Sequence, residues 1–562
     1  MDQSGSDATR QNRARPDGSV SGSDQARPDQ NRADQARADR NQPGPAGPDR
    51  SRFEVARAQS PADAKDTERI TVPTGAQAES PAEAPAERAM PRRIEPRAED
   101  HAVAVTPKKK GRKRKVLGVV AAVVVLGAGT AFAGVGLDWF AGPPTPTTAA
   151  PAPPADIAFA LRGVGTDAPA PSAAGVAAVV SGPAASAALA PLSGRVVDPA
   201  SGTTLWEQGQ GSAYTPASTI KILTSAAALL SLDHTAQFST KVVRGAEPGT
   251  VVLVGGGDPT LTALPAGQRS MYPGAPTIDD LVAQVRKTGP VTKVLYDTSR
   301  YTGDGFAPGW DPADVAAGYV TPISPLIMDG GRTDPKAVDP PRHAAPAETV
   351  AQTFAQRLGV TAVATGPAPA NAEVLGEVKS QPVDRLVENL MQVSDNVLAE
   401  TMAREVAIAT GAEPSFAGAA QAVVKVLTDN GFDLTGGTVV DGSGLSPNDK
   451  IPARLLADVL VAAASPNPTA PKTAKLRPLL TALPVAGGSG TLAGRYGESI
   501  GKGWLRAKTG TLTGVNSLAG VVVDKDGRLL VFAFMSLSTL PNADVRQALD
   551  VLAASLRSCG CS

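Results

Sequence analysis

The chain has 562 residues, more than one hydrophobic core usually organises, so we expect at least two folded units together with non-globular segments. Its 57 Gly and 50 Pro follow no three-residue period, which excludes a collagen and indicates long linkers. The three His are too few and too far apart for a His-ligated metal centre, and the two Cys, at 559 and 561, lie too near the end of the chain for a Cys-rich zinc site or a disulfide framework to hold the fold. We therefore expect no metal and no cofactor.

The formal net charge is zero, but the charges are unevenly placed along the chain. Residues 108–115 read KKKGRKRK, with seven basic side chains and no acid, and the chain after them holds 31 basic against 36 acidic residues. A mildly acidic folded part argues against a nucleic-acid-binding surface. We expect no nucleic-acid partner.

Residues 1–107 contain one aromatic residue, Phe53, and consist mainly of Asp, Arg, Gln, Ala, Pro and Ser. Such a composition cannot bury enough apolar surface to offset the entropy that is lost when a backbone becomes ordered. We therefore predict a disordered tail over residues 1–107.

Residues 116–137 follow the basic cluster directly and carry no charge, with Thr130 as the single polar side chain. A helix of this length spans about 30 Å of hydrocarbon. Alone, the cluster could be a nuclear-type or nucleic-acid patch, and Ala131–Ala133 resembles a signal-peptidase site, but the region before the apolar run is very long for a cleaved signal. Basic residues beside an apolar run indicate an uncleaved transmembrane anchor with a cytoplasmic tail, so everything after Leu137 lies outside.

Residues 138–158 are rich in Pro and predict a polyproline-like stalk in front of a folded catalytic or binding module. That module opens with strand-like patterns at Val176–Val180, Gly194–Asp198 and Thr203–Trp206. A helix with Pro in its first turn is expected to follow from Pro216.

The C-terminus mirrors this arrangement, with strands expected at Leu518–Val523 and Arg528–Met535 and a helix beginning near Asn542. A pair of strands plus a helix at each end predicts one α/β unit built from both ends of the folded part. The predicted boundaries are 159–235 and 386–558 for this unit, and 236–385 for a domain inserted into it.

The motif Ser218-Thr-Ile-Lys221 lies just inside the predicted helix start. A spacing of three residues puts the hydroxyl and the amine on one helical face, and the helix N-terminus favours negative charge near the serine. An unprotonated lysine there could take the serine proton. Alone the motif is weak, because a solvated first turn is the simpler explanation, but apolar surroundings and partners downstream favour catalysis.

Two further motifs lie downstream. Ser394-Asp-Asn396 separates helices expected at Val383–Val393 and Val397–Ile408, where it could be a simple N-cap. Lys508-Thr-Gly510 lies in a strand-like run before the C-terminal strands, where it could be a surface turn. Together and in this order, Ser-x-x-Lys, Ser-x-Asn and Lys-Thr-Gly are the three motifs of penicillin-binding proteins and class A β-lactamases.

Three further sequence segments support a match to one group of these proteins: Pro216–Thr219, Leu253–Leu261 and Asp441–Ser446. From about Ser172 to Arg557 the chain resembles the D-alanyl-D-alanine carboxypeptidase/endopeptidase family of low-molecular-mass, class C penicillin-binding proteins. The resemblance implies an acyl-serine (β-lactamase-like) α/β domain, with a five-stranded antiparallel sheet flanked by helices and an inserted domain. It also implies peptidoglycan stem peptides as substrates, β-lactams as covalent inhibitors, and a bacterial cell membrane location with the catalytic domain extracytoplasmic.

The resemblance implies three catalytic residues. Ser218 is then the nucleophile, Lys221 is its base, and Ser394 relays a proton to the leaving amine. No His lies near any of the motifs, which leaves lysine as the base and argues against a Ser-His-Asp triad.

The resemblance also implies a substrate-binding set. Asn396 donates to the amide carbonyl of the substrate, and the terminal carboxylate binds at Lys508 and Thr509, which Gly510 follows. The backbone N–H groups of the nucleophile and of Thr511 form the oxyanion hole.

Two departures bear on selectivity. Class A β-lactamases deacylate with a Glu four residues before an Asn, and no Glu after the second motif has an Asn at that offset, so a β-lactam ester should persist. Many family members follow the Asp441–Ser446 stretch with an Arg, where this chain has Pro447, which leaves peptide-end selectivity open.

We predict a serine DD-peptidase that removes the terminal D-Ala of stem peptides, with cleavage of D-Ala crosslinks as a secondary expectation. One alternative is a catalytically silent penicillin-binding-like scaffold whose tail recruits cytoplasmic partners; it would lack a motif residue, and none is lacking. The other is a β-lactam or ester hydrolase, which would turn over a chromogenic cephalosporin rapidly.

The predicted anchor fixes an orientation that can be tested in intact cells. External protease is expected to remove the domain beyond Leu137 and to spare residues 1–107, because only the former would be outside the membrane. Immunoblots against an epitope at each end measure the result. Loss of the tail epitope while the domain survives would overturn the orientation.

Overall fold

The computed structural model describes residues 168–209 and 211–560. The predicted tail, basic cluster, transmembrane helix and stalk lie outside these residues. Over the two described ranges, none of the helices combines the length and the apolar character that crossing a membrane requires.

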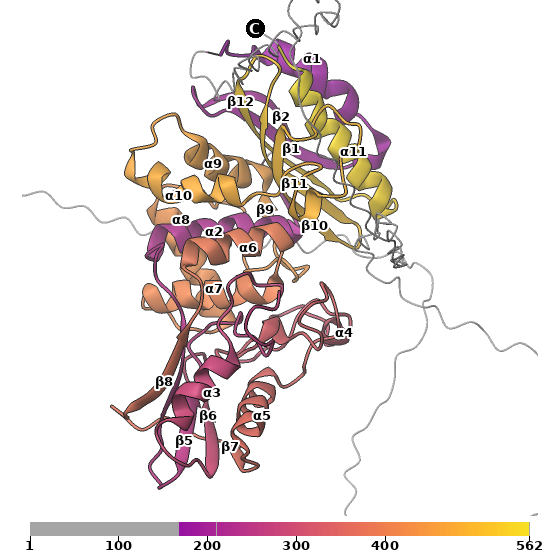
Figure 1. Ribbon diagram of the computed structural model, residues 1–562. Helices are drawn as coiled ribbons and strands as arrows, with labels where there is room; N and C mark the ends of the chain where they lie inside the picture. Colours follow the sequence, from indigo (N-terminus) through magenta and orange to yellow (C-terminus); the bar gives the residue numbers. More distant parts are fainter. Residues whose placement is uncertain (1–167, 210, 561–562) are drawn as a thin grey trace, which may run out of the picture. The chain divides into compact units, whose positions relative to one another are not determined.

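A five-stranded antiparallel sheet joins the two ends of the described chain, as predicted (Figure 1). Its strand order is β10-β11-β12-β1-β2. The central pairing sets Val196 opposite Phe532, so the first strand of the sheet lies beside the last. The strands are β1 (Leu192–Asp198), β2 (Thr203–Gln208), β10 (Leu505–Leu512), β11 (Val515–Val523) and β12 (Leu529–Ser536).

Alternate residues of each strand point to opposite sides of the sheet, and both sides are covered by helices. Phe532 and Phe534 of β12 pack with α1 (Ala173–Ala184) and α11 (Asn542–Ser555), whereas Val531 and Ala533 face the larger helical layer (Figure 1). That layer contains α2 (Lys221–Ser231), α6 (Val383–Val393), α7 (Asn396–Ala409), α8 (Phe416–Asp429), α9 (Ala453–Ala464) and α10 (Pro471–Ala482).

The strand expected at Val176–Val180 is wrong, because this segment lies inside helix α1. Ser172 caps the helix by accepting a hydrogen bond from the Gly175 N–H at 3.1 Å. The two end valines are buried, and at a spacing of four residues they lie on one helical face toward α11. Packing of this stripe outweighs the β-propensity of valine.

A second sheet lies within residues 239–379 and has the order β7-β6-β5-β4-β8. Its β5–β6 and β6–β7 pairs are parallel, and its other pairs are antiparallel. It has a hydrophobic core of its own with α3 and α5. The elements are β4 (Ser239–Arg244), β5 (Thr250–Val254), α3 (Ile278–Arg286), β6 (Lys293–Asp297), α4 (Ala313–Ala316), α5 (Pro346–Leu358), β7 (Val363–Thr365) and β8 (Val374–Lys379). The predicted limits of the inserted domain, 236 and 385, stay predictions.

Outside the two larger sheets, β3 (Ala213–Tyr214) pairs with β9 (Ile451–Pro452). This short pairing brings the segment before the Ser218 motif next to the start of α9. It thereby holds two parts of the chain together that are more than two hundred residues apart in sequence.

A buried ion pair joins the segment between β6 and α5 to the helical layer. Arg332 Nη2 lies 3.0 Å from Asp395 Oδ2 at the start of α7, and both side chains are almost fully buried. The Tyr272 hydroxyl donates to the same carboxylate at 2.8 Å. Burial alone would raise the pKa of Asp395, but the charges of Arg332 and Arg342 outweigh it and lower the pKa to about 2.

This pair predicts a pH-dependent contribution to stability. The folded pKa of Asp395 lies below the ordinary value of about 4, so its stabilisation is complete above that pH and is lost as pH falls through about 2. Asp395→Asn should lower the free energy of unfolding by about 3 kcal/mol at pH 7, since it also leaves Arg332 buried without its ion pair.

Urea unfolding at pH 7 and at pH 2.5 measures this difference, which should shrink at the lower pH. Asp429→Asn is the control, because Asp429 forms an exposed pair with Lys425 and such pairs contribute at most about 1 kcal/mol. An equal loss for Asp395→Asn at both pH values would contradict the assignment.

Candidate active site

Ser218 lies in a 3-10 turn, Ala217–Ile220, that leads directly into α2. The expected helix therefore begins with a tighter turn than the α-helix predicted from Pro216. Ala217 has a positive φ of 47°, which is uncommon for a residue with a side chain. A Cβ on Gly444 would lie 2.0 Å from the Ala217 carbonyl oxygen, so only glycine fits beside this turn.

Lys221 is fully buried one turn further along, and its amine points at the serine. Lys221 Nζ lies 3.0 Å from Ser218 Oγ, as expected from their spacing. The same nitrogen donates to Asn396 Oδ1 and to the Ser443 carbonyl, each at 2.6 Å. The amine is therefore held among oxygens from α2, α7 and the loop after residue 440.

The second motif forms the turn between α6 and α7. Asp395 caps α7 by accepting from the Leu398 N–H at 2.9 Å, so the capping interpretation of this motif is correct for its middle residue. Ser394 takes a left-handed conformation with φ 60° and lies 2.7 Å from Lys508, while Asn396 contacts Lys221. The residues on either side of the cap therefore contact different lysines: Ser394 contacts Lys508, and Asn396 contacts Lys221.

Asn396 is held at both ends of its amide. Besides the contact of its oxygen with Lys221, its Nδ2 donates to the Tyr319 carbonyl at 3.0 Å. The amide nitrogen carries two hydrogens, and this contact uses one of them.

The third motif lies on β10, the edge strand of the main sheet. Lys508 is fully buried, and its Nζ donates to Ser394 Oγ at 2.7 Å and to the Thr509 carbonyl at 2.9 Å. Thr509 Oγ1 donates to Thr491 Oγ1 at 3.0 Å. The predicted strand and its lysine therefore meet the second motif directly.

Gly510 fixes how closely β10 approaches the nucleophile. A Cβ at this position would lie 2.6 Å from the Pro216 carbonyl oxygen and 3.0 Å from the Ser218 nitrogen. Ser517 on β11 strengthens the approach by donating to the Pro216 carbonyl at 2.6 Å. Thr511, the next residue, donates from Oγ1 to Asn516 Oδ1 at 3.4 Å.

Six of the eight predicted residues thus form two clusters around the buried lysines: Ser218 and Asn396 contact Lys221, and Ser394 and Thr509 contact Lys508. Gly510 packs against the turn that holds Ser218, and Thr511 contacts Asn516 on β11. Three contacts of these clusters were not predicted: the Ser443 carbonyl, the Tyr319 carbonyl and the Thr491 hydroxyl. The Asp441–Ser446 phrase pointed to the first of these. The sequence offers no signal for the other two, because the Tyr319 contact uses a backbone oxygen and threonine, as at Thr491, is a common residue type.

The peptide carbonyl of Pro447, which follows the Asp441–Ser446 stretch, accepts hydrogen bonds from Thr215 and Lys450 at 3.3 and 3.0 Å. In the part of the chain that the structure describes, no three His, Cys, Asp or Glu side chains gather closely enough to hold a metal ion.

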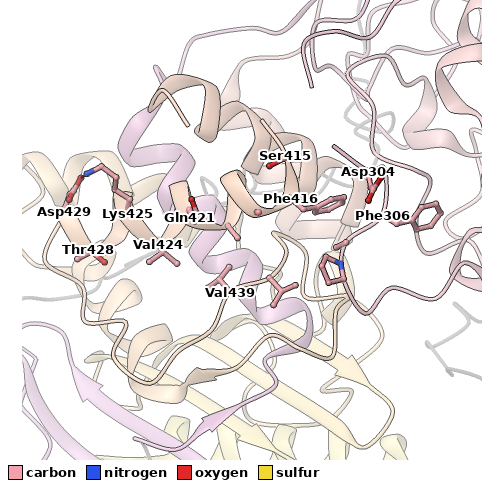
Figure 2. Close-up of a pocket in the computed structure, with 15 residues that line it drawn as sticks. Asp304, Phe306, Ser415, Phe416, Gln421, Val424, Lys425, Thr428, Asp429 and Val439 are labelled. Carbon is pink, nitrogen blue, oxygen red and sulfur yellow. The ribbon is translucent and has the colours of Figure 1, made fainter. Parts of the chain in front are cut away.

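A cavity of about 850 Å³ opens between α8 and residues 304–308 (Figure 2). Its wall contains apolar side chains such as Phe306 and Phe416, with Lys425 and Asp429 at one end. None of the eight predicted site residues lines it. Val439 and Val440 do, and they lead directly into the loop that contacts Lys221.

Comparisons with known proteins agree with this geometry. The model of the D-Ala-D-Ala carboxypeptidase 3 (S13) family matches residues 174–343 and 340–556. A carboxypeptidase of Mycobacterium tuberculosis is 45% identical over 425 residues, which cover 74% of this chain and 91% of the relative. Carboxypeptidase DacB of Mycolicibacterium smegmatis is 44% identical over 456 residues, 79% of this chain and 96% of the relative.

Among solved structures, penicillin-binding protein 4 of Haemophilus influenzae superposes with a TM-score of 0.55 at 22% identity. The match covers 67% of this chain and 97% of that one, and it supports the fold. Because the family model spans most of the described residues and the three motifs meet around two buried lysines, the chain belongs to the D-Ala-D-Ala carboxypeptidase 3 (S13) family of serine DD-peptidases.

Proposed function

We propose that Ser218 forms an ester with peptidoglycan stem peptides and that hydrolysis of this ester completes removal of the terminal D-Ala. The observation that carries this assignment is the 3.0 Å contact between Lys221 Nζ and Ser218 Oγ, since it gives the serine a base within hydrogen-bond reach. Membership of the family supports the reaction class, and two relatives of this chain are named carboxypeptidases.

In acylation, neutral Lys221 takes the Ser218 proton while Oγ attacks the carbonyl carbon of the penultimate D-Ala. The backbone N–H groups of Ser218 and Thr511 stabilise the oxyanion. The C–N bond then breaks, and the proton that Lys221 took passes through the Ser394 hydroxyl to the departing amine, so Lys221 is neutral again before deacylation. The Ser394 hydroxyl is held in place by its hydrogen bond to Lys508. The products of this half-reaction are free D-Ala and the acyl-Ser218 ester.

In deacylation, a water molecule attacks the ester carbonyl and gives a proton to Lys221. The bond to Ser218 Oγ breaks, and the proton returns to that oxygen, which restores the enzyme and releases the shortened peptide. If the leaving amine belongs to a neighbouring stem peptide instead of free D-Ala, the same steps cleave a crosslink.

Substrate recognition follows from charge and geometry. Lys508 and Thr509 bind the terminal carboxylate, and the second N–H of Asn396 Nδ2, beyond the one given to Tyr319, donates to the substrate amide carbonyl. Gly510 leaves β10 without a side chain, which lets the strand pack closely against the backbone of the turn that holds Ser218.

The proposal includes an extracytoplasmic location on a single-pass anchor in a bacterial cell membrane. It is supported by the basic residues 108–115 directly before the apolar residues 116–137. Peptidoglycan lies on that side of the membrane, so substrate and catalytic domain would meet there.

The reaction predicts distinct effects for substitutions at the two lysines. Ser218→Ala and Lys221→Ala should each lower D-alanine release by at least about a thousandfold, because both halves of the reaction pass through these groups. Lys508→Ala should chiefly raise KM, because it removes the partner of the terminal carboxylate. The assay is release of D-alanine from a pentapeptide ending in D-Ala-D-Ala.

Lys472→Ala is the matched control, because Lys472 is exposed on α10 and donates to the Asn430 carbonyl away from the site. If the folded wild type releases no D-alanine, or if Ser218→Ala releases as much as wild type, the catalytic assignment fails and the scaffold alternative replaces it.

A penicillin should acylate Ser218 stoichiometrically, and the ester should hydrolyse slowly. The physical reason is that no Glu after the second motif stands four residues before an Asn; Glu400, the nearest in sequence, is buried and accepts from the Gly442 N–H at 3.0 Å. Mass spectrometry of the intact protein measures the adduct and its lifetime. An adduct on another residue, or rapid turnover of a chromogenic cephalosporin, would favour the hydrolase alternative.

A further inference from the structure

The Ser443 carbonyl restricts how Lys221 can hold its hydrogens. A neutral amine has two N–H donors and one lone pair. The 2.6 Å contacts with the Ser443 carbonyl and with Asn396 Oδ1 occupy two donors, which directs the lone pair toward Ser218 Oγ at 3.0 Å. The position of this carbonyl therefore bears on whether Lys221 is aimed as a base.

Asp441 fixes the loop that carries this carbonyl. Its Oδ1 accepts from the N–H groups of Ser443 and Gly444 at 3.0 and 2.6 Å. Its Oδ2 accepts from the Ser446 N–H at 2.7 Å. One buried carboxylate thus closes the loop on both sides of residue 443.

Trp310 holds that carboxylate from outside the catalytic motifs. Its indole Nε1 donates to Asp441 Oδ2 at 2.8 Å. The ring is buried and packs edge-to-face against Phe306 and Phe416, with centroids 6.2 and 5.1 Å away. These two ring contacts restrict the orientation of the indole, so its N–H stays directed at the Asp441 carboxylate.

The other charged groups around Asp441 come from α7 and from the loop itself. Glu400 accepts from the Gly442 N–H, and Asp449 accepts from the Val440 N–H at 2.7 Å. Burial, and then the nearby charge of Asp441, raise the pKa of both carboxyls above their ordinary values. Arg404, also on α7, faces Glu400 and partly offsets this rise.

We propose that Trp310 and Asp441 are positioning residues that set the rate of Ser218 acylation by holding the Ser443 carbonyl against Lys221. This inference rests on the proposed roles of Ser218 and Lys221. Trp310 lies between the first two motifs in sequence and has its hydrogen bond with Asp441, so it would orient Lys221 only through the loop. If the loop only lined the binding site, loosening it would weaken binding of the inhibitor as well as slow acylation. If it positions Lys221, loosening it should slow acylation alone.

The test uses the full chain and a fluorescent penicillin, with the acylation rate constant at saturation measured separately from the apparent dissociation constant. Trp310→Phe keeps an aromatic ring and removes one hydrogen bond to a charged group, so the rate constant should fall about tenfold. The dissociation constant should stay within about twofold. Trp206→Phe is the matched control: this ring packs edge-to-face on Phe534 in the main sheet, and neither constant should change.

A double-mutant cycle separates this relay from a general loss of order. Asp441→Asn should also lower the acylation rate constant, and adding Trp310→Phe to it should cause no further fall, because the contact is already broken. Additive losses, a Trp310→Phe rate constant within twofold of wild type, or a loss confined to the dissociation constant would each overturn the inference.

Thermal unfolding checks that each variant is folded. If Trp310→Phe does not fold, Asp441→Asn is judged by the same separation of rate and dissociation constants, and a loss in the dissociation constant alone overturns the inference. If wild type itself is not acylated, or if Ser218→Ala is acylated equally, the proposed function has failed instead.

Discussion

Two lysine side chains, Lys221 and Lys508, have no exposed surface, and this constraint organises the centre of the protein. A buried amine loses its hydration, at a cost of about several kcal/mol when it is charged, and this cost must be offset by oxygens placed by the fold. Lys221 takes its oxygens from α2, α7 and the Asp441–Ser446 loop, and Lys508 takes one from the end of α6. The elements that meet here are therefore the ones whose relative positions the chemistry needs.

The segment Ser394–Asn396 shows how one turn meets two requirements. Asp395 caps α7 and receives the charge of Arg332, while the residues on either side of it reach the two lysines. Capping and catalysis had been alternative interpretations of the same three residues. The structure shows the cap, and the cap and its ion pair fix the turn from which Ser394 and Asn396 project toward the two lysines, so capping is compatible with the catalytic roles proposed for these two residues.

Much of the catalytic centre could be predicted, because its chemistry needs rare combinations of residue types at fixed spacings. The Ser218 motif, the Lys508 strand and both helices around Ser394 are placed as the sequence indicated. The valines of α1 were misread as a strand, since β-branched residues favour strands until packing decides otherwise.

What could not be predicted acts over long sequence distances or through the backbone. The Ser443 and Tyr319 carbonyls have no side-chain signature, and the contacts Trp310–Asp441 and Arg332–Asp395 join residues that only the folded chain brings together. A pattern in the sequence records which residues can do chemistry. It does not record which peptide oxygens will surround them.

The pairing of β1 with β12 has a consequence for how the chain matures. Leu192 pairs with Ser536, so the first strand of the main sheet is synthesised long before its central partner exists. The second sheet, with its own core between these strands in sequence, can form while the rest is still emerging. Until the last strands arrive, β1 and β2 would present unpaired backbone groups, and such edges invite association with other chains. Ser218 cannot meet β10 until the chain has been made beyond Leu512, so the proposed active site can assemble only late in synthesis.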